Sequence, residues 1–422
     1  VLISFGTRPE AIKMVPVILA CKKRLKTMET WVMSTGQHRE MIEQVMENFD
    51  MMRIIDFNLD VMAHNQTLSD LSAKVLLETT RVLEQLEADA VVVQGDTTTA
   101  ALVALAAFYQ RIPVVHVEAG LRTRKIYSPF PEETNRNIIG NIASLHFPAT
   151  LWARKNLLGE SKHQYQIVLT GNPVVDALYM TLRKPLSNTI KSIRKWVEQS
   201  GCTGRMLVLT AHRRENHSDR LVSIITAMGS ILKKYSNVCI VYPVHPNPNV
   251  RTTLRQVVPA FIYARLQNEA TIETLTSGAT LPVILPSTLD DKDKEHFKRM
   301  LLIEPVSHDT LAELMSDSYF ILTDSGGIQE ESVSLGKPVL ILKDETERPE
   351  VVHAGAAVLC GTESSKIELE AYKLLAPAPN THYQRMRNNA KNKRIYGDGH
   401  AGEYIASEID NRLRLGFTNE SI

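Results

Sequence analysis

The chain has 422 residues, of which 44% are hydrophobic and 23% charged, and its 48 basic and 47 acidic side chains give a net charge of +1. So small a net charge provides no basic field for a nucleic acid or an anionic membrane surface, so neither is expected as a partner. The apolar fraction is that of a chain that buries a full core, and the length corresponds to about two domains.

The four cysteines are scattered, without a Cys-x-x-Cys pair, at Cys21, Cys202, Cys239 and Cys360. Such spacing is typical of reduced core thiols in a cytoplasmic protein rather than of a disulfide framework or a zinc site. The 13 histidines form no His-Glu-x-x-His motif, so no metal and no cofactor are expected. The first residues do not read as a secretory signal, and no apolar run is long enough for a membrane span.

In the first half of the chain, short apolar runs alternate with longer amphipathic stretches, as in β-α-β units on a parallel sheet. The predicted strands are Val1–Phe5, Thr30–Ser34, Ala90–Gln94, Val114–Val117, Leu145–Pro148 and Gln166–Leu169. The predicted helices between them are Pro9–Lys23, Glu40–Phe49, Thr67–Gln85, Thr98–Gln110 and Glu132–Ile142.

A second series of strands is predicted at Met206–Thr210, Cys239–Pro243, Met300–Ile303, Tyr319–Thr323, Val339–Leu342 and Ala357–Cys360. Near-continuous apolar runs such as MLVLT and PVLIL are typical of parallel strands that are buried on both faces. We therefore predict an α/β chain of two Rossmann-like domains whose strand-to-helix loops face a central cleft. The predicted domains are residues 1–172 and 173–402, and Gly402–Leu415 is helical in pattern but too short for a domain of its own.

Residues 256–298 show no clear strand and end in the charged run DDKDKEHFKR. A loop of this length is unusual in a compact domain. We interpret it as a solvated surface insertion, and a lid or partner-binding element is the alternative.

The run YGDGHAG matches a Gly-x-Gly-x-x-Gly pattern at Gly397, Gly399 and Gly402. The residues before it form no buried strand, and too little chain follows for a dinucleotide-binding unit. We interpret this run as a turn and the start of a helix.

The motif FGTRPEAIK predicts a strand that ends at Phe5, a turn at Gly6 and Thr7, and then a helix. Free backbone N–H groups at such a helix start favour an anion, and Arg8 and Lys13 would add positive charge. A plain turn with solvated cations is the alternative.

The motif TDSGGIQEE repeats this design in the second half. Gly326 and Gly327 would let phosphate oxygens approach the backbone closely, and Ser325 would donate a hydrogen bond. Glu331 is spaced to accept hydrogen bonds from a ribose diol. The pattern favours a phosphate–ribose clamp over an ordinary loop.

Three carboxylates and a histidine come at or just after predicted strand ends and helix starts: Asp96 in QGDTTTA, Glu118 in HVEAGLRT, Glu132 in PFPEETNR and His212 in TAHRREN. Taken singly, each acid is more often a helix cap or a surface charge, and Asp96 is a plausible N-cap. Taken together, they favour general acid–base catalysis, because such groups usually lie on strand-end loops.

The motifs FGTRPEAIKM, QHREM, QGDTTT, HVEAGLRT, PEETNR, AHRRE, YPVHPNPNVR and LTDSGGIQEESVSLGKPVL occur in this order along the chain. They resemble the non-hydrolysing UDP-N-acetylglucosamine 2-epimerases, which interconvert UDP-GlcNAc and UDP-ManNAc, over about residues 1–255 and 300–402. The resemblance implies two domains in the GT-B arrangement, a final helix (about residues 403–422) that returns to the first domain, and a homodimer.

The resemblance also implies the chemistry, namely anti elimination of UDP to give 2-acetamidoglucal and re-addition of UDP. Asp96, Glu118 and Glu132 match the essential acids of the family, and His212 matches its active-site histidine. The implied substrate-binding residues are Arg8, Lys13, Arg213, Ser325, Gly326, Gly327 and Glu331. Which acid acts on which face of the sugar is left open by the sequence.

A second set of residues matches the site where bacterial members bind another UDP-GlcNAc as an activator: Gln37, His38, Arg39, Glu40, Arg136 and His245. This set favours the non-hydrolysing, allosterically regulated type. The alternatives are a hydrolysing epimerase, a GT-B glycosyltransferase, and a non-catalytic sensor of the sugar nucleotide.

Overall fold

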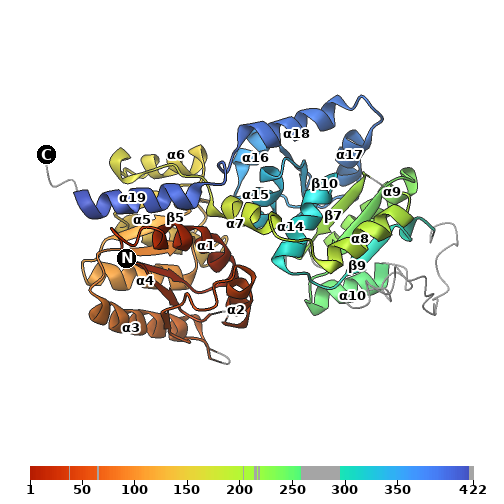
Figure 1. Ribbon diagram of the computed structural model, residues 1–422. Coiled ribbons are helices and arrows are strands. Elements are labelled where there is room, and N and C mark those ends of the chain that lie inside the picture. Colours follow the sequence, from red (N-terminus) through yellow and green to blue (C-terminus); the bar gives the residue numbers. More distant parts are fainter. Residues whose placement is uncertain are drawn as a thin grey trace. The chain divides into compact units, whose positions relative to one another are not determined.

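The computed structural model describes residues 1–417 apart from 38, 64, 65, 203, 213–215, 217, 218 and 258–294. The chain divides into two compact units, unit 1 from Val1–Met180 with Tyr396–Ile422, and unit 2 from Thr181–Ile395. Each unit is a parallel sheet flanked by helices (Figure 1). The boundaries of these units lie near residues 180 and 395, whereas the sequence placed the domain boundaries at 172 and 402.

Within the described residues, unit 1 has a six-stranded parallel sheet in the order β3-β2-β1-β4-β5-β6. Its strands are β1 Leu2–Phe5, β2 Trp31–Ser34, β3 Phe57–Asn58, β4 Val91–Gln94, β5 Val114–Val117 and β6 Leu145–Phe147. Its helices are α1 Arg8–Lys22, α2 Arg39–Asn48, α3 Leu68–Leu86, α4 Thr98–Tyr109, α5 Glu132–Ile142, α6 Leu151–Gly159, α7 Pro173–Leu182 and α19 Ala401–Leu415. Because the strand order reverses between β1 and β4, the loops that follow these strands open a crevice at the carboxyl edge of the sheet.

One strand prediction for unit 1 was wrong, and one strand was missed. The short edge strand β3 was missed because two residues, Phe57 and Asn58, make no apolar run. Gln166–Leu169 is not a strand, since Gln164–Gln166 forms a 3-10 turn and Ile167 makes only an isolated bridge to His146. An apolar pattern of four residues does not ensure a continuous ladder at a sheet edge.

The described part of unit 2 repeats the design with the strand order β12-β11-β10-β7-β8-β9. Its strands are β7 Met206–Thr210, β8 Cys239–Pro243, β9 Met300–Ile303, β10 Phe320–Thr323, β11 Val339–Ile341 and β12 Ala357–Leu359. Its helices are α8 Asn188–Gln199, α9 Asp219–Lys234, α10 Pro248–Val257, α14 His308–Asp317, α15 Gly326–Ser334, α16 Pro349–His353, α17 Ser364–Leu375 and α18 Thr381–Lys393. The insertion predicted at 256–298 lies for the most part outside the described residues.

The central strands are buried along their whole length, because helices cover both faces of each sheet. This burial explains why the strands read as continuous apolar runs. All four cysteines lie in the described part of the chain, where they are buried and unbridged, as predicted for reduced core thiols. None of the described helices combines the length and the apolar character that a membrane crossing requires.

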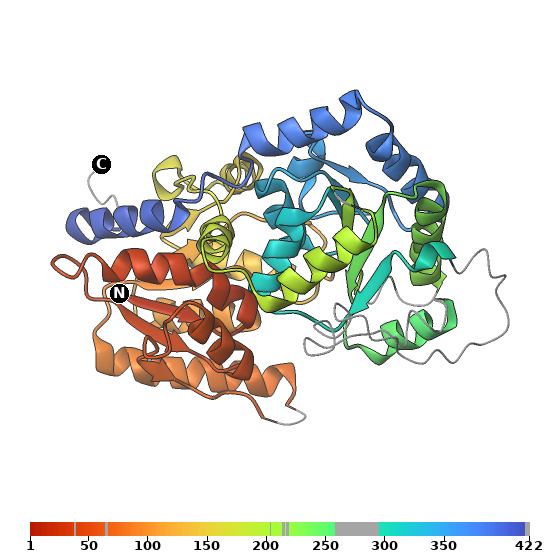
Figure 2. The same ribbon diagram turned by 45° about the vertical axis from the view of Figure 1, so that its right-hand side comes forward.

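The final helix, α19, packs beside α1 in unit 1 (Figures 1 and 2). A Cβ atom on Gly402 would lie 2.7 Å from the carbonyl oxygen of Pro16, so only glycine allows this approach. The Asp176 carboxylate accepts hydrogen bonds from the N–H groups of Ala401 (3.2 Å) and Gly402 (2.9 Å) and thereby caps the helix. Together with the positive φ angle of Gly399 (+87°), this confirms that YGDGHAG is a turn and a helix start.

Candidate functional site

In unit 1 the predicted site residues gather where β1, β4 and β5 end. Glu118 follows β5 directly and adopts a φ of +61°, which is unusual for a residue with a side chain. Its carboxylate accepts hydrogen bonds from Lys13 Nζ (2.8 and 2.6 Å), from Asn172 Nδ2 (2.9 Å) and from Gln94 Nε2. The side chain is only 4% exposed. Such a strained, fully held carboxylate is typical of a functional site.

Lys13, which the sequence assigned to the diphosphate, therefore has its ammonium group on Glu118 in this structure. The two residues come from different elements, since Lys13 lies on α1 and Glu118 follows β5. The ion pair balances a buried negative charge that would otherwise be costly.

Asp96 lies two residues beyond β4, and the guanidinium group of Arg136 holds its Oδ2 at 2.9 Å from Nε and 2.6 Å from Nη2. Arg136 also contacts Glu133 Oε2 at 2.9 Å. Burial by itself would raise the pKa of Glu133, but hydrogen bonds from the N–H groups of Thr123 and Arg124, with Arg136, hold it below the ordinary value. Arg136, predicted as an activator-binding residue, thus directly orients a predicted catalytic acid.

Glu132 is the first residue of α5 and is half-buried. Its Oε2 atom is buried and has no hydrogen-bond partner among the described residues. Glu132 therefore has a buried carboxylate oxygen to which no described residue donates a hydrogen bond.

The turn after β1 does not have the free backbone donors that the sequence suggested. The N–H groups of Gly6 (3.0 Å) and Thr7 (2.7 Å) both donate to Glu10 Oε2, so the prediction of free groups there was wrong for these two residues. Glu10 Oε1 accepts a hydrogen bond from Thr97 Oγ1 at 2.6 Å, and burial raises the pKa of this carboxyl group. Arg8 is half-buried and makes no ion pair within the described residues, so its charge remains available to a ligand.

The QHRE motif is described only in part. Gln37 Oε1 accepts a hydrogen bond from Thr99 Oγ1 at 3.5 Å, which places it beside the β1 and β4 turns. Glu40 is exposed at the start of α2, where Arg39 is the first residue. His38 lies outside the described residues.

In unit 2, His212 follows β7 and is held by Asp324, which follows β10. The backbone N–H of His212 donates to Asp324 Oδ2 at 2.8 Å, and His212 Nδ1 lies 3.2 Å from Asp324 Oδ1. Asp324 is fully buried and also accepts a hydrogen bond from Asn216. The backbone hydrogen bond and the nearby carboxylate therefore keep His212 beside Asp324.

His245 stacks on His212, with ring centroids 5.3 Å apart and an interplanar angle of 16°. The sequence assigned these two histidines to different sites, catalytic and activator, but the structure places their rings together. Arg213, the next predicted residue, lies outside the described residues.

The DSGG turn contains two glycines with different surroundings. A Cβ on Gly326 would lie 2.7 Å from Arg348 Cζ and 3.0 Å from Glu347 Oε1, so any larger residue there would displace the Arg348 side chain. Among the described residues, a Cβ on Gly327 would meet no atom within 4 Å. The N–H of Ser325 donates to Thr323 Oγ1 at 3.0 Å and is therefore not free for a phosphate.

Glu331, the predicted ribose acceptor, is 7% exposed on α15. Its Oε2 lies 3.4 Å from His308 Nε2, and neither atom has a hydrogen bond within the described residues. His308, the first residue of α14, therefore belongs with the candidate ribose site.

Several residues in these contacts were not singled out from the sequence: Glu10, Gln94, Asn172, His308, Asp324 and Arg348. Asp324 had a signal, since it directly follows the strand β10 and precedes the Ser-Gly-Gly turn. Glu10 had one too, since Thr7 and Glu10 have the spacing of a capping box. The other four carry no local signal, because their contacts are with residues distant in the chain.

Two histidines are buried next to the unit 1 site. His116 Nε2 donates a hydrogen bond to the carbonyl oxygen of Gly95 at 2.7 Å, and the His116 ring lies 6.5 Å from that of His146. Burial lowers the pKa of His116 to about 4 and that of His146 to about 3. Both rings are therefore neutral at pH 7.

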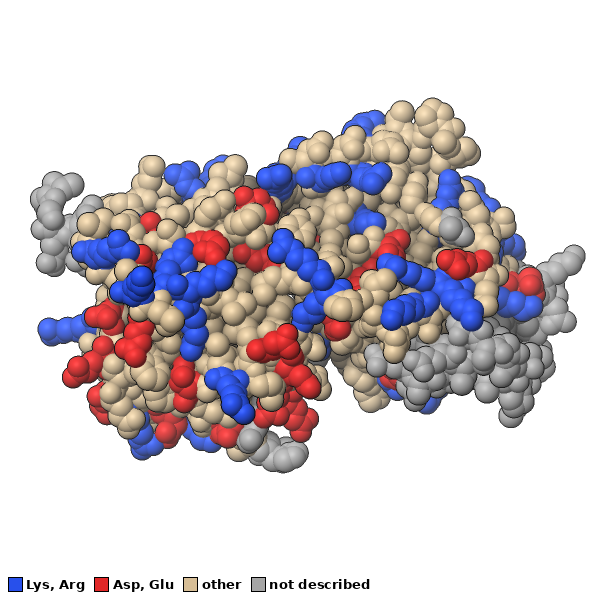
Figure 3. All heavy atoms as spheres, viewed as in Figure 1, with Lys and Arg blue, Asp and Glu red and all other residues tan. Residues whose placement is uncertain are grey.

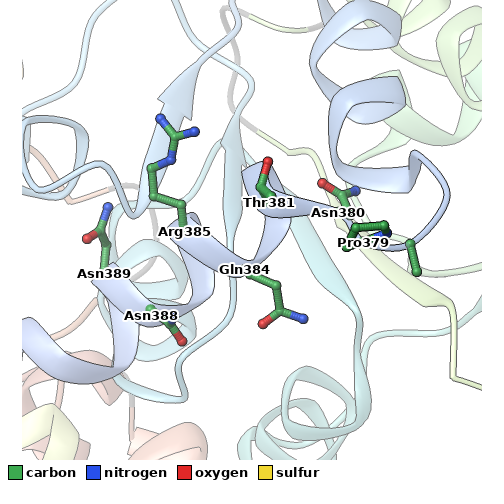
Figure 4. Close-up of a pocket in the computed structure, with 8 residues that line it drawn as sticks. Pro379, Asn380, Thr381, Gln384, Arg385, Asn388 and Asn389 are labelled. Atoms are coloured by element: carbon green, nitrogen blue, oxygen red, sulfur yellow. The ribbon is translucent and has the colours of Figure 1, made fainter.

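The surface charges and the hollow beside α18 do not indicate a further site. On the face in Figure 3, positive and negative side chains are interspersed over each unit. A hollow of about 490 Å³ is lined by Ala378, Pro379, Asn380, Thr381, Gln384, Arg385, Asn388 and Asn389, and Figure 4 shows these side chains on and just before α18. No predicted site residue lines it. Among the described residues, no group of three His, Cys, Asp or Glu side chains could hold a metal ion.

Two doubly wound parallel sheets, with charged strand-end loops in one unit and a glycine turn in the other, define an α/β protein of the GT-B-like class. A family model of UDP-N-acetylglucosamine 2-epimerases matches residues 20–410. The chain belongs to this family.

Individual relatives agree. The UDP-N-acetylglucosamine 2-epimerase of Neisseria meningitidis is 40% identical over 413 residues, which are 97% of this chain and 98% of that protein. A crystal structure of the N. meningitidis UDP-GlcNAc 2-epimerase bound to UDP-GlcNAc matches with a TM-score of 0.77 and 39% identity, covering 97% of this chain and 98% of the other. The Methanocaldococcus jannaschii UDP-GlcNAc 2-epimerase in complex with UDP-GlcNAc and UDP matches with a TM-score of 0.70 and 30% identity, covering 97% and 99%.

Proposed function

We propose that this protein interconverts UDP-GlcNAc and UDP-ManNAc by the non-hydrolysing route. The observation that carries the proposal is the pair of carboxylates, Asp96 and Glu118, that β4 and β5 present side by side, each held by a cation. The proton at C2 of UDP-GlcNAc is not adjacent to a carbonyl group, so its direct removal and return is not feasible at neutral pH.

Elimination avoids this difficulty. A base takes the C2 proton while the C1–oxygen bond breaks and UDP leaves with the bonding electron pair, which gives 2-acetamidoglucal. An oxygen of UDP then re-adds at C1 while an acid delivers a proton to the opposite face of C2. The reaction needs two proton-transfer groups and positive charge for the departing diphosphate.

The described residues suggest a division of these roles. Glu132 has a buried carboxylate oxygen that no described residue hydrogen-bonds, so this oxygen is available to exchange a proton. Asp96 and Glu118 are held in fixed orientations, and His212 is oriented by Asp324. Arg8 offers a charge that the described residues do not neutralise, and Lys13 would reach a diphosphate only by sharing its bond with Glu118.

The nucleotide would bind at the DSGG turn. Gly327 is open, Ser325 precedes the first turn of α15, and Glu331 with His308 would accept and donate hydrogen bonds to a ribose. The UDP-GlcNAc in the N. meningitidis structure supports a UDP-sugar as the ligand.

We further propose that a second UDP-GlcNAc acts as an activator through Gln37, His38, Arg39, Glu40, Arg136 and His245, and that the protein works as a cytoplasmic homodimer. The M. jannaschii complex, which holds both UDP-GlcNAc and UDP, supports the presence of two nucleotides. The contacts of Arg136 with Asp96 would link an activator site directly to a catalytic acid.

The test is incubation with UDP-GlcNAc in deuterated water, followed by proton NMR of the products. We expect UDP-ManNAc to form, with deuterium at C2 of both sugars. Free ManNAc and UDP as dominant products would instead indicate the hydrolysing type. Transfer of the sugar to an acceptor without exchange at C2 would indicate a glycosyltransferase. Binding of UDP-GlcNAc without exchange would indicate a sensor. An Asp96→Asn variant should lose turnover but keep UDP binding, whereas Glu84→Gln, an exposed acid on α3, should change neither.

A further inference from the structure

We infer that Asn172 is a positioning residue for Glu118 and that it links the orientation of this carboxylate to the two segments that connect the units. The inference rests on the proposed function, because Glu118 matters only if it takes part in the reaction. Asn172 lies just before α7 and is completely buried. Its Nδ2 atom donates to Glu118 Oε1 at 2.9 Å.

The other polar atoms of Asn172 fix its place. The Oδ1 atom accepts a hydrogen bond from the N–H of Val174 at 3.1 Å, which caps the start of α7. The backbone N–H of Asn172 donates to the carbonyl oxygen of Tyr396 at 2.8 Å. One residue therefore contacts the outgoing helix, the returning chain and the carboxylate of Glu118.

Tyr396 is the first residue after the chain returns to unit 1, and the outgoing chain leaves unit 1 after Met180. These two passages, the outgoing segment at Gly171 and the returning segment at Gly397, touch through their backbones. A Cβ on Gly171 (φ +83°) would lie 2.9 Å from the Cα of Gly397, and a Cβ on Gly397 (φ +100°) would lie 2.9 Å from the Cα of Gly171. Neither glycine tolerates a side chain, so a displacement of one passage must displace the other or break the bond to Asn172.

Lys13 and Gln94, which also donate hydrogen bonds to Glu118, come from other parts of unit 1. Lys13 belongs to α1 and Gln94 to β4, and both elements are part of the buried body of unit 1. Asn172, in contrast, comes from the segment that leads out of the unit. Its amide is a neutral donor, so it selects the orientation of the Glu118 carboxylate without adding charge. A movement of the connecting segments would therefore turn Glu118 while Lys13 keeps its charge balanced.

The test separates the two roles of the Asn172 side chain. Serine is as good an N-cap as asparagine but is too short to reach Glu118, so Asn172→Ser keeps the cap of α7 and removes the donor. We expect its melting temperature to stay near that of the wild type while kcat falls roughly 10- to 100-fold, since a small misplacement of a catalytic group costs about that much. KM and UDP affinity should change little.

A second variant gives a readout that a merely structural role would not move. In Asn172→Asp, an ionised carboxylate would repel Glu118, whereas a protonated one would donate to it as asparagine does. We expect kcat of this variant to rise relative to the wild type as the pH is lowered from 8.5 to 5.5. A pH profile parallel to that of the wild type would overturn the inference.

The link to the connecting segments is tested with Gly397→Ala. It should lower kcat as Asn172→Ser does, whereas Gly201→Ala, another left-handed glycine (φ +68°) with open space around it, should not. Wild-type turnover for Asn172→Ser would refute the positioning role. If the wild type itself shows no exchange at C2, the proposed function fails first, so the two failures are distinguishable.

Discussion

The two glycines of the DSGG turn give the sharpest prediction. Packing against Arg348 accounts for Gly326, whereas no contact of the described residues accounts for Gly327. Gly326 is pressed against Arg348, whose guanidinium group is bonded to Glu330 and, at 2.9 Å, to Glu347. The Arg348 side chain is 10% exposed and that of Glu330 is 1% exposed. For Gly327, no atom of the described part of the chain lies within 4 Å of the position that a Cβ would take, and the residue is not in the left-handed region.

Gly326→Ala should therefore destabilise unit 2. Its methyl group would displace Arg348 from the buried carboxylate of Glu330, and breaking a buried ion pair costs about 3–5 kcal/mol. For a unit of this size, that corresponds to a fall in melting temperature of roughly 10 °C. Gly327→Ala should leave the melting temperature unchanged or slightly higher, since alanine favours a helix over glycine by up to about 1 kcal/mol.

UDP affinity should respond in the opposite way. A methyl group at Gly327 would occupy the space where we expect phosphate oxygens, and at least a tenfold loss of affinity, or about 1.4 kcal/mol, should follow. The assay combines calorimetric titration with UDP and a melting curve of each variant. Unchanged UDP affinity for Gly327→Ala would refute the assignment of this turn to the phosphate. A wild-type melting temperature for Gly326→Ala would refute the packing argument.

Three further predictions concern the pH, the final helix and the histidine of unit 2. Because burial depresses the pKa of His116 to about 4 and of His146 to about 3, the unfolded chain binds protons first as the pH falls below about 6.5. Stability should then decrease between pH 6.5 and 4 by about 1.4 kcal/mol per pH unit for each histidine, measured by denaturant unfolding, and His146→Leu should flatten this dependence. Gly402→Ala should cost about 1–3 kcal/mol and expose α19 to proteolysis, because its methyl would meet a backbone oxygen of α1. Asp324→Asn should lower kcat at least tenfold and alter its pH profile, because it removes the negative charge that lies 3.2 Å from His212 Nδ1.

Each of these has a contradicting outcome. A stability that is constant from pH 7 to pH 5 would show that the buried histidines accept protons in the folded state. Unchanged protease resistance of Gly402→Ala would mean that the two helices can separate without loss. A wild-type pH profile for Asp324→Asn would show that His212 needs no carboxylate.

The sequence by itself determined the α/β class, nearly all the strands and the residues at the strand ends. The physical reason is local, since a parallel strand covered on both faces must be apolar along its length and the ligand-binding loops must follow its carboxyl end. Asp96, Glu118, His212 and the DSGG turn were found in this way. The short strand Phe57–Asn58 escaped because it has too few residues to show a period.

Only the tertiary structure decided which side chains meet. Lys13 and Glu118 are 105 residues apart in the chain, and His212 and Asp324 are 112 apart. No local pattern records such a pairing, because it depends on the order of the strands and on the paths of the loops between them. The same reason hid Asn172. Its contact with Glu118 arises only where the outgoing and returning passages of the chain come together.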